Sequence, residues 1–220
     1  IFISSGGPGS PFEDEDKQWD KDYFTLLDKI WNHNQTSEQK KYIFFICHSF
    51  QMMARFFQFG EVNQRFINSF GVMPFLKTDE GKNDTILKDL TNPFYAADIR
   101  HWQVVNPNQK KIDEFGAKIL SWEIPEEENK DNPAITSIRM SNEIAGTQFH
   151  PEADPEGMTL HFGKEEIRNQ VIENFGKEKY DNMMDHLDDP DKIALTHDTI
   201  LPSFIENALD SIYSQTAVLV

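Results

Sequence analysis

The chain is poor in cysteine, in positive charge and in long apolar runs. It has one cysteine among 220 residues, so no disulfide can form within it, and we expect a protein of the reducing cytoplasm. Its 21 basic residues are outnumbered by 37 acidic ones, which gives a net charge of −16. That balance argues against nucleic acids and anionic membranes as partners. No apolar stretch approaches the roughly 20 residues that a membrane-spanning helix requires.

Motifs for nucleotides and metals are also missing. The sequence contains no Gly-x-x-x-x-Gly-Lys-Ser/Thr loop, the motif that cradles phosphates in many ATP-binding domains. No spacing of histidine, cysteine and aspartate matches a familiar metal site. We therefore expect neither a metal nor a cofactor.

The one cysteine stands where a strand is expected to turn into a helix. Cys47 follows the apolar run 42–46, and a segment with helical character follows it at 50–59. Such a turn holds its central residue at the edge of a sheet, next to the positive end of the helix dipole, which favours a thiolate. This is the geometry of a nucleophile elbow. The alternative is that Cys47 is a small buried core residue, as free cysteines often are.

The pattern along the chain predicts an α/β fold with a mostly parallel sheet. The residues at 1–5 resemble the end of a buried strand already under way, so we expect further N-terminal strands upstream. Apolar residues recur at helical spacing over 20–33, and the pattern over 61–95 is irregular. Further strands are predicted at 99–105, 117–123, 135–140 and 144–149.

Beyond residue 157 the pattern becomes helical. Two apolar stripes, within 164–186 and 201–213, predict helices that pack by an ordinary amphipathic face. We therefore predict one domain over 1–156 and a helical C-terminal extension over 157–220 that packs on it.

Three separated segments together resemble the class I glutamine amidotransferase family, the triad type. They read Ser-Ser-Gly-Gly-Pro-Gly-Ser-Pro at 4–11, Ile-Cys-His-Ser-Phe-Gln at 46–51 and Thr-Gln-Phe-His-Pro-Glu at 147–152. The resemblance covers about residues 1–155, and the chain is similar to the amidotransferase domain of GMP synthase. It implies a three-layer, flavodoxin-like amidotransferase fold with helices on both faces of the sheet.

The resemblance also implies a catalytic triad. Cys47 would attack the side-chain amide of glutamine and form a thioester, while His150 would take the thiol proton and return it to the leaving ammonia. Glu152 would hold the imidazole in one tautomer. Residues two apart at a strand end point the same way, as His150 and Glu152 would need to do.

Two backbone groups and one side chain complete the implied site. The resemblance places an oxyanion hole at the N–H groups of Gly7 and His48, and a glycine loop suits this because backbone must approach the substrate closely. Gln51 matches the family glutamine that helps to seat the substrate. The segment 99–105 lies where the family has a substrate-contacting strand.

The elbow departs from the family pattern Gly-x-Cys-x-Gly. Phe45 and Ser49 occupy the two glycine positions, and Phe50 occupies a position that is usually histidine. Elbow glycines relieve crowding at a strained turn. From the sequence we expect these residues to alter the pocket around the thiol and therefore the substrate.

Three functions remain open at this point. The first is hydrolysis of glutamine to glutamate and ammonia, with the ammonia used by a separate synthetase subunit, since no ATP-binding motif is present. The second is acyl transfer similar to that of homoserine acyltransferases, which often lack the second elbow glycine. The third is a catalytically degenerate binding module. Glutamine or another small molecule is the expected ligand, and a homodimer is one possible assembly.

Overall fold

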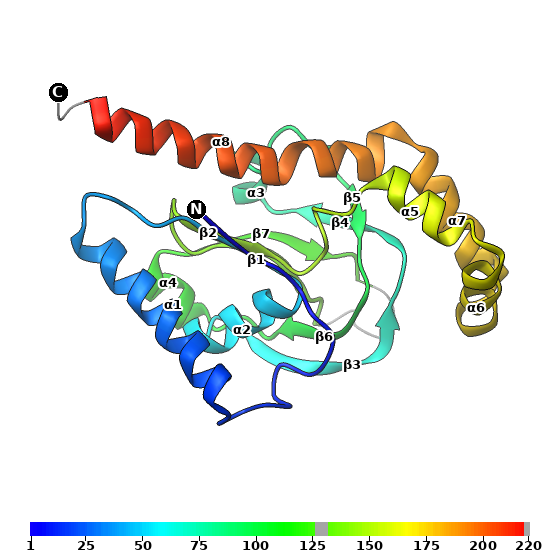
Figure 1. The fold of residues 1–220 in the computed structure, drawn as a ribbon, viewed down its shortest axis with the longest axis horizontal. Helices are drawn as coiled ribbons and strands as arrows, with labels where there is room; N and C mark the ends of the chain where they lie inside the picture. Colours follow the sequence, from blue (N-terminus) through cyan, green and yellow to red (C-terminus); the bar gives the residue numbers. More distant parts are fainter. Residues whose placement is uncertain (126–131, 218–220) are drawn as a thin grey trace.

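The structure is a computed structural model that describes residues 1–125 and 132–217 (Figure 1). The described residues form a seven-stranded sheet in the order β1-β2-β9-β8-β7-β4-β5 and a two-stranded sheet of β3 and β6. The strands are β1 (Phe2–Ser4), β2 (Ile43–Ile46), β3 (Glu61–Ser69), β4 (Val72–Lys77), β5 (Phe94–Ala97), β6 (Arg100–Val105), β7 (Lys118–Glu123), β8 (Ile135–Arg139) and β9 (Ile144–Thr147).

Helices lie on both faces of the seven-stranded sheet. They are α1 (Gln18–Thr36), α2 (His48–Phe57), α3 (Asp79–Asn83), α4 (Gln109–Phe115), α5 (Pro155–Phe162), α6 (Glu165–Phe175), α7 (Lys177–Asp188) and α8 (Leu195–Ala217), with an irregular helical segment η1 (Pro190–Ala194) before α8. In Figure 1, α8 runs across one side of the sheet and α1, α2 and α4 lie on the other. This confirms the predicted layers and the C-terminal helices, although the last three residues of the predicted extension lie outside the described residues.

The prediction of a mostly parallel sheet is wrong for the larger part of it. Only the pairs β1–β2 and β2–β9 are parallel, and every pair from β9 to β5 is antiparallel. Parallel neighbours need a long crossover connection, which α1 supplies between β1 and β2. β8 and β9 are instead joined by a tight turn in which Met140 N–H donates to Ile144 O at 2.8 Å, and such a short link forces antiparallel pairing.

The region 61–95, irregular in sequence, contains β3, β4, α3 and β5. Most side chains of β3 are partly or fully exposed, and its pairing with β6 shifts register between Gln64 and Ser69. A strand that is exposed on both faces and bulged has no clean alternation of apolar and polar residues. The sequence signal for this strand was therefore weak.

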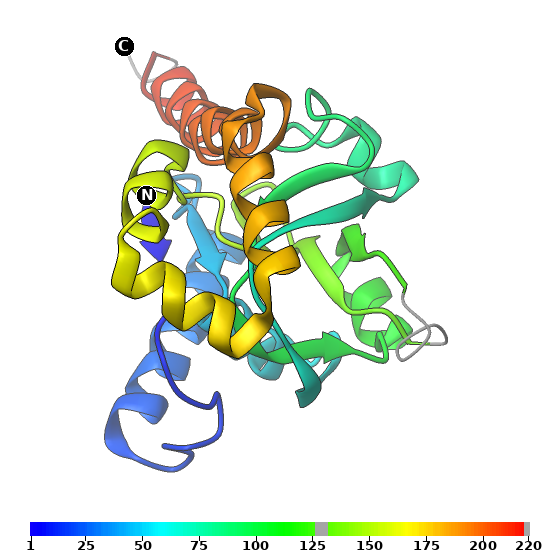
Figure 2. The same ribbon diagram turned by 90° about the vertical axis from the view of Figure 1, so that its right-hand side faces the viewer.

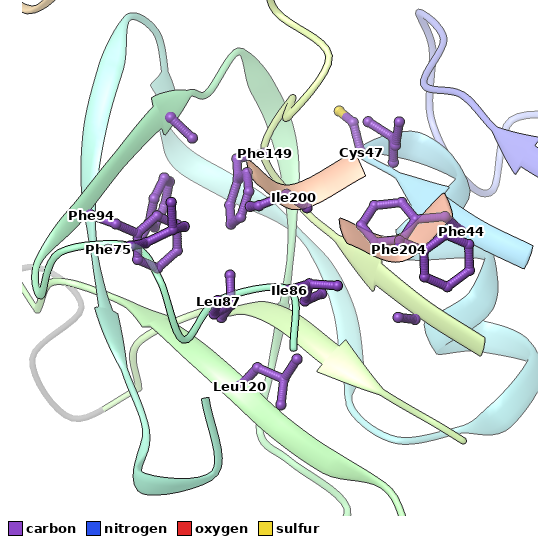
Figure 3. Close-up of a cluster of buried hydrophobic side chains, with 14 of the residues drawn as sticks. Phe44, Cys47, Phe75, Ile86, Leu87, Phe94, Leu120, Phe149, Ile200 and Phe204 are labelled. Carbon is purple, nitrogen blue, oxygen red and sulfur yellow. The ribbon is translucent and has the colours of Figure 1, made fainter. Parts of the chain in front are cut away.

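Apolar side chains fill both faces of the sheet. On the α8 side, Phe44 of β2 meets Phe204 with ring centroids 5.1 Å apart (Figure 3). On the other side, residues of α1 and α2 pack on Ile43 and Phe45 of β2. The strand before Cys47 is thus buried on both faces, which holds the elbow at a fixed position.

A third apolar cluster joins α5, α6 and α7 to the edge of the sheet near β4 and β5. Figure 2 shows these helices, in yellow to orange, in front of the sheet. Phe175 of α6 stacks on Phe70 at 4.2 Å between ring centroids. Tyr180 donates its hydroxyl to Phe162 O at 3.0 Å. None of the described helices is long and apolar enough to cross a membrane.

Candidate active site

Cys47 forms a strained turn between β2 and α2. Its backbone has φ 53° and ψ −107°, a region that non-glycine residues seldom adopt and that is tolerated where the surroundings enforce it. Its N–H donates to Thr147 O of β9 at 2.9 Å, which continues the β2–β9 pairing up to the turn. α2 begins at the next residue, so the thiol lies at a helix N-terminus. Figure 3 shows Cys47 at the margin of the core cluster, with its sulfur directed away from the aromatic rings.

Phe45 and Phe50 do not alter the pocket around the thiol. Both side chains belong to the apolar cluster under α1 and α2, with 1% and 0% of their surface exposed, and neither lines the cavity at Cys47. Phe45 is accommodated because Gly146 lies opposite it on β9, where an added Cβ would be 2.9 Å from Phe45 Cβ. The expectation that these two residues change the substrate pocket is therefore wrong. Both rings pack within the apolar cluster instead.

Ser49 ties the elbow together. Its hydroxyl oxygen accepts from Ile46 N–H at 2.8 Å and also makes a hydrogen bond to the Ser4 carbonyl oxygen of β1. The side chain is buried and does not line the cavity. Ser49 thus links the turn at the nucleophile to the strand that leads into the glycine-rich loop.

His150 and Glu152 form a hydrogen-bonded pair just after β9. His150 Nδ1 lies 2.8 Å from Glu152 Oε1, and the His150 N–H donates to Ala97 O of β5 at 2.8 Å. Burial lowers the pKa of His150, but hydrogen bonds and charge interactions with Cys47 and Glu152 outweigh burial and raise it to about 10. The geometry thus brings together all three residues that the sequence suggested as a triad.

The glycine-rich loop closes over Cys47 and His150. A Cβ added at Gly6 would lie 3.1 Å from Cys47 Cβ and 3.2 Å from His150 Cε1, whereas a Cβ at Gly7 would meet no atom within 4 Å. Gly6 is therefore the position that needs to lack a side chain. The sequence suggested Gly7 for its backbone N–H and gave no sign of the close clearance at Gly6 in the same motif.

A cavity of about 810 Å³ opens in front of the thiol. Its wall includes all the predicted site residues except Glu152, which lies behind His150. The His48 N–H belongs to the first turn of α2, where backbone N–H groups lack acceptors within the helix. Gly7 lines the cavity from the opposite loop.

Gln51 is buried beside the cavity rather than free within it. Its side-chain amide donates to Trp102 O and to Gln148 Oε1, each at 3.3 Å. Trp102 also contacts Phe12, with ring centroids 5.5 Å apart. Gln51 thus connects α2 to β6 and positions one wall of the cavity.

Strand β6 and the residue before it form that wall. Ile99 O lies 4.0 Å from Cys47 Sγ, and Arg100, His101 and Trp102 follow along the cavity. The strand was expected to contact substrate, but the sequence did not show which of its residues line the cavity. Which side chains of β6 are exposed and which are buried depends on its pairing with β3, and this pairing could not be deduced from the sequence.

A buried ionic cluster fixes the start of β6. Arg100 Nε donates to both oxygens of Asp98, its Nη2 donates to Glu123 at 2.6 Å, and Asp98 also accepts from Ser69 at 2.6 Å. Burial lowers the pKa of Arg100, but the two carboxylates outweigh burial and raise it. Arg100 therefore stays charged and anchors the wall opposite the nucleophile.

Among the described residues, no carboxylate lines the cavity. In a chain with a net charge of −16, the lining side chains that can ionise are Cys47, His48, Arg100, His101 and His150. Such a lining, together with a helix N-terminus, suits a ligand that carries a carboxylate. Within the described residues, no cluster of histidine, cysteine, aspartate or glutamate is arranged to hold a metal ion.

Known proteins share this fold. A glutamine amidotransferase from Thermotoga maritima superposes with a TM-score of 0.64 and 15% identity, covering 94% of this chain and 78% of that one. A glutamine amidotransferase from Methylobacillus flagellatus superposes with a TM-score of 0.54 and 14% identity, covering 96% of this chain and 72% of the other. At these identities the likeness establishes the fold.

Sequence comparison identifies the family. No curated protein sequence matches the chain. The family model described as glutamine amidotransferase class I, however, matches residues 1–173. That match covers most of the chain, and it agrees with the resemblance carried by the three motifs. The chain belongs to the class I glutamine amidotransferase family.

Proposed function

We propose that the chain hydrolyses the side-chain amide of glutamine to glutamate and ammonia through Cys47, His150 and Glu152. The observation that carries the proposal is the arrangement of these three side chains around the elbow. The nucleophile lies at a helix N-terminus, and the imidazole interacts with the thiol on one side and with Glu152 on the other. This arrangement suits an activated thiolate.

His150 acts first as an acid in this mechanism. With its pKa raised to about 10, it is an imidazolium at neutral pH and lies beside Cys47. The thiolate attacks the amide carbon, the carbonyl oxygen becomes an oxyanion, and the carbon–nitrogen bond breaks as His150 gives its proton to the leaving ammonia. Water then attacks the thioester while His150 takes a proton from it, and glutamate leaves as the thiolate is restored.

The oxyanion is assigned to the N–H groups of Gly7 and His48. Both residues line the cavity beside Cys47, and backbone donors aimed at developing negative charge contribute strongly to such reactions. Gln51 is assigned a supporting role, since its amide is already bonded to Trp102 and Gln148.

Under this proposal, another protein or domain binds the molecule that accepts the ammonia. The resemblance to the amidotransferase domain of GMP synthase favours a synthetase subunit that supplies the acceptor and ATP. We expect such a subunit to raise glutaminase activity when the two are combined.

Glutamate release from glutamine tests the proposal. Wild type is expected to release glutamate, and Cys47→Ala is expected to lose at least about 10³-fold in kcat, as removal of a nucleophile does. A diazoketone analogue of glutamine should label wild type at Cys47, as seen by intact mass and peptide mapping. If the folded protein neither releases glutamate nor takes up the label, with candidate synthetases present, hydrolysis of glutamine is excluded and the binding-module alternative is favoured.

The acyltransferase alternative uses the same cysteine with a different donor. Ser49, the residue that suggested it, makes hydrogen bonds within the turn and does not reach the cavity, so it gives no positive support. Incubation with succinyl- or acetyl-CoA separates the two functions. A mass increase at Cys47 would favour acyl transfer over glutamine hydrolysis.

A further inference from the structure

A second hollow lies against the proposed triad, on the side of the C-terminal helices. It has a volume of about 460 Å³ and lies between the end of β5, the turn after β9 and helix α5. Most of its wall is apolar, formed by Ala97, Ile99, Ala153, Met158 and Phe162. A volume of this size, within the range of small-molecule sites, is enough for an aryl or branched alkyl group.

The hollow and the active-site cavity share two residues, Ile99 and His150. His150 Nδ1 is bonded to Glu152, so Nε2 is the atom left to exchange a proton with the substrate. The leaving nitrogen must come within hydrogen-bond distance of that atom when it accepts the proton. Any group attached to this nitrogen therefore lies next to His150, whose ring also lines the second hollow.

The two carboxylates at the hollow are already engaged, and His161 also lines it, with its ring centroid 5.0 Å from that of Phe162. Asp154 caps α5 by accepting from the N–H groups of Glu156 and Gly157 at 3.3 and 2.7 Å. Glu152 is bonded to His150. These two carboxylates would repel a negatively charged substituent, while the apolar wall would accept an uncharged one.

We propose that this hollow receives the N-substituent of γ-glutamyl amides, so that the chain hydrolyses glutamines that carry an uncharged apolar group on the side-chain nitrogen. The inference rests on the proposed thioester mechanism. It adds a substrate class, since glutamine itself leaves the hollow empty. The γ-glutamyl part occupies the cavity in front of Cys47, and the amine part occupies the hollow beyond His150.

The reaction balances with water as the one co-reactant. Cys47 Sγ forms a bond to the amide carbon, the carbon–nitrogen bond breaks, and the His150 proton goes to the departing primary amine. Water then attacks the thioester carbon and gives one proton to His150. The products are glutamate and the free amine.

Kinetics on the full chain test the inference, with glutamate formation as the common measurement. The substrates are glutamine, N5-benzylglutamine and N5-(3-carboxypropyl)glutamine. Wild type is expected to show a KM for the benzyl compound at least about tenfold below that for glutamine, because burial of the ring adds binding energy. The carboxypropyl compound is expected to be the poorest of the three.

Two tryptophan variants on α5 provide the matched comparison. Met158→Trp fills the hollow and should lower the ratio of kcat/KM for benzylglutamine over glutamine by at least about tenfold. Leu160→Trp adds the same side chain on the same helix at a position with 75% of its surface exposed and outside the hollow. It should leave both the ratio and the activity on glutamine unchanged.

The outcomes separate the inference from the proposed function. If wild type hydrolyses glutamine but not benzylglutamine, or if Met158→Trp leaves the ratio unchanged, the hollow is not a substituent site and the proposed function stands. If wild type hydrolyses neither compound, both are overturned. Hydrolysis of benzylglutamine that falls selectively in Met158→Trp supports both, since the same triad must act.

Discussion

The two sides of the elbow differ in the residues that surround them. On the core side, Phe45 and Phe50 are fully enclosed among apolar side chains of α1 and α2. On the cavity side, the thiol faces glycine backbone, histidines and the wall formed by β6. The core side holds the turn in place by packing, and the cavity side leaves polar groups free for a ligand.

This difference shows where the elbow can vary. The two bulky departures from the family pattern fall on the core side, where Gly146 makes room for Phe45. A core tolerates changes in side-chain size when the neighbouring positions compensate. On the cavity side, a side chain at Gly6 would press on both Cys47 and His150. Substitutions on the two sides should therefore have separable effects, on stability and on activity.

The largest effect is expected on the cavity side, from Glu152→Gln. Loss of the orienting carboxylate should lower kcat/KM for glutamine by roughly 10³- to 10⁴-fold, as in other triads. Glu152 also helps to raise the pKa of His150 to about 10. Wild-type kcat/KM should accordingly fall only as pH rises through about 10, where the imidazolium loses its proton, and in Glu152→Gln this fall should move to lower pH.

A pH–rate profile of both proteins measures this shift. Glu156→Gln is a suitable control, because Glu156 is an exposed acid on α5 that has no contact with His150. A wild-type profile that already falls near pH 7 would contradict the raised pKa of His150.

The next largest effect is expected on the core side, from Phe50→Ala. Phe50 has 0% of its surface exposed and meets Phe59 with ring centroids 5.7 Å apart. Its truncation should cost about 3–5 kcal/mol in the free energy of unfolding. Urea unfolding measures the loss, and Phe50→Leu should retain most of the stability.

The activity of folded Phe50→Ala tests whether the core side and the cavity side of the elbow act independently. Because the side chain does not line the cavity, KM for glutamine should stay close to that of wild type at a temperature where the variant is folded. A large rise in KM with little loss of stability would mean that the two sides of the elbow are not separable.

The sequence predicted the site better than the sheet. Short motifs at the elbow, the glycine loop and the segment after β9 named Cys47, His150 and Glu152, which the structure brings together, because each motif keeps its chemistry within a few residues. Strand direction depends instead on which distant segments pair. The short link between the strands predicted at 135–140 and 144–149 is too short for a crossover and reverses the chain, but the partners of the other strands could not be deduced from a local pattern.

The same limit applies to the walls of the site. Gly6 and Gly7 are adjacent and chemically identical, and only the positions of Cys47 and His150 in space show that Gly6 is the crowded one. The orientation of Phe45 likewise depends on a glycine on another strand. The residue types indicated the chemistry of the site. They did not show how closely segments that are far apart in sequence approach one another.

A smaller effect on the cavity side is expected from Gly6→Ala. The added methyl group would lie 3.1 Å from Cys47 Cβ and 3.2 Å from His150 Cε1, so the loop or the imidazole must shift. A displacement of catalytic groups by a fraction of an ångström to one ångström lowers kcat/KM by up to about 10²-fold. Measured glutaminase activity should fall while stability changes little.

Gly7→Ala is the matched control for that variant. The same methyl group one residue later would meet no atom within 4 Å, and the backbone N–H is retained. Because Gly7 lines the cavity and its N–H is assigned to the oxyanion, kcat/KM should fall, but by less than in Gly6→Ala. Equal losses in the two alanine variants would show that loop flexibility, rather than clearance at Gly6, limits the reaction.

The smallest effect is expected from Ser49→Ala, at the boundary of the two sides. The change removes the hydrogen bonds of Ser49 to the Ile46 N–H and to the Ser4 carbonyl oxygen, at a cost of about 1–3 kcal/mol in unfolding free energy. Ser37→Ala, which removes a hydroxyl from an exposed hydrogen bond, should cost much less. Because Ser49 joins the turn to the strand before the glycine loop, kcat for glutamine should fall by a few-fold along with stability. Loss of stability with unchanged kcat would place Ser49 wholly with the core side.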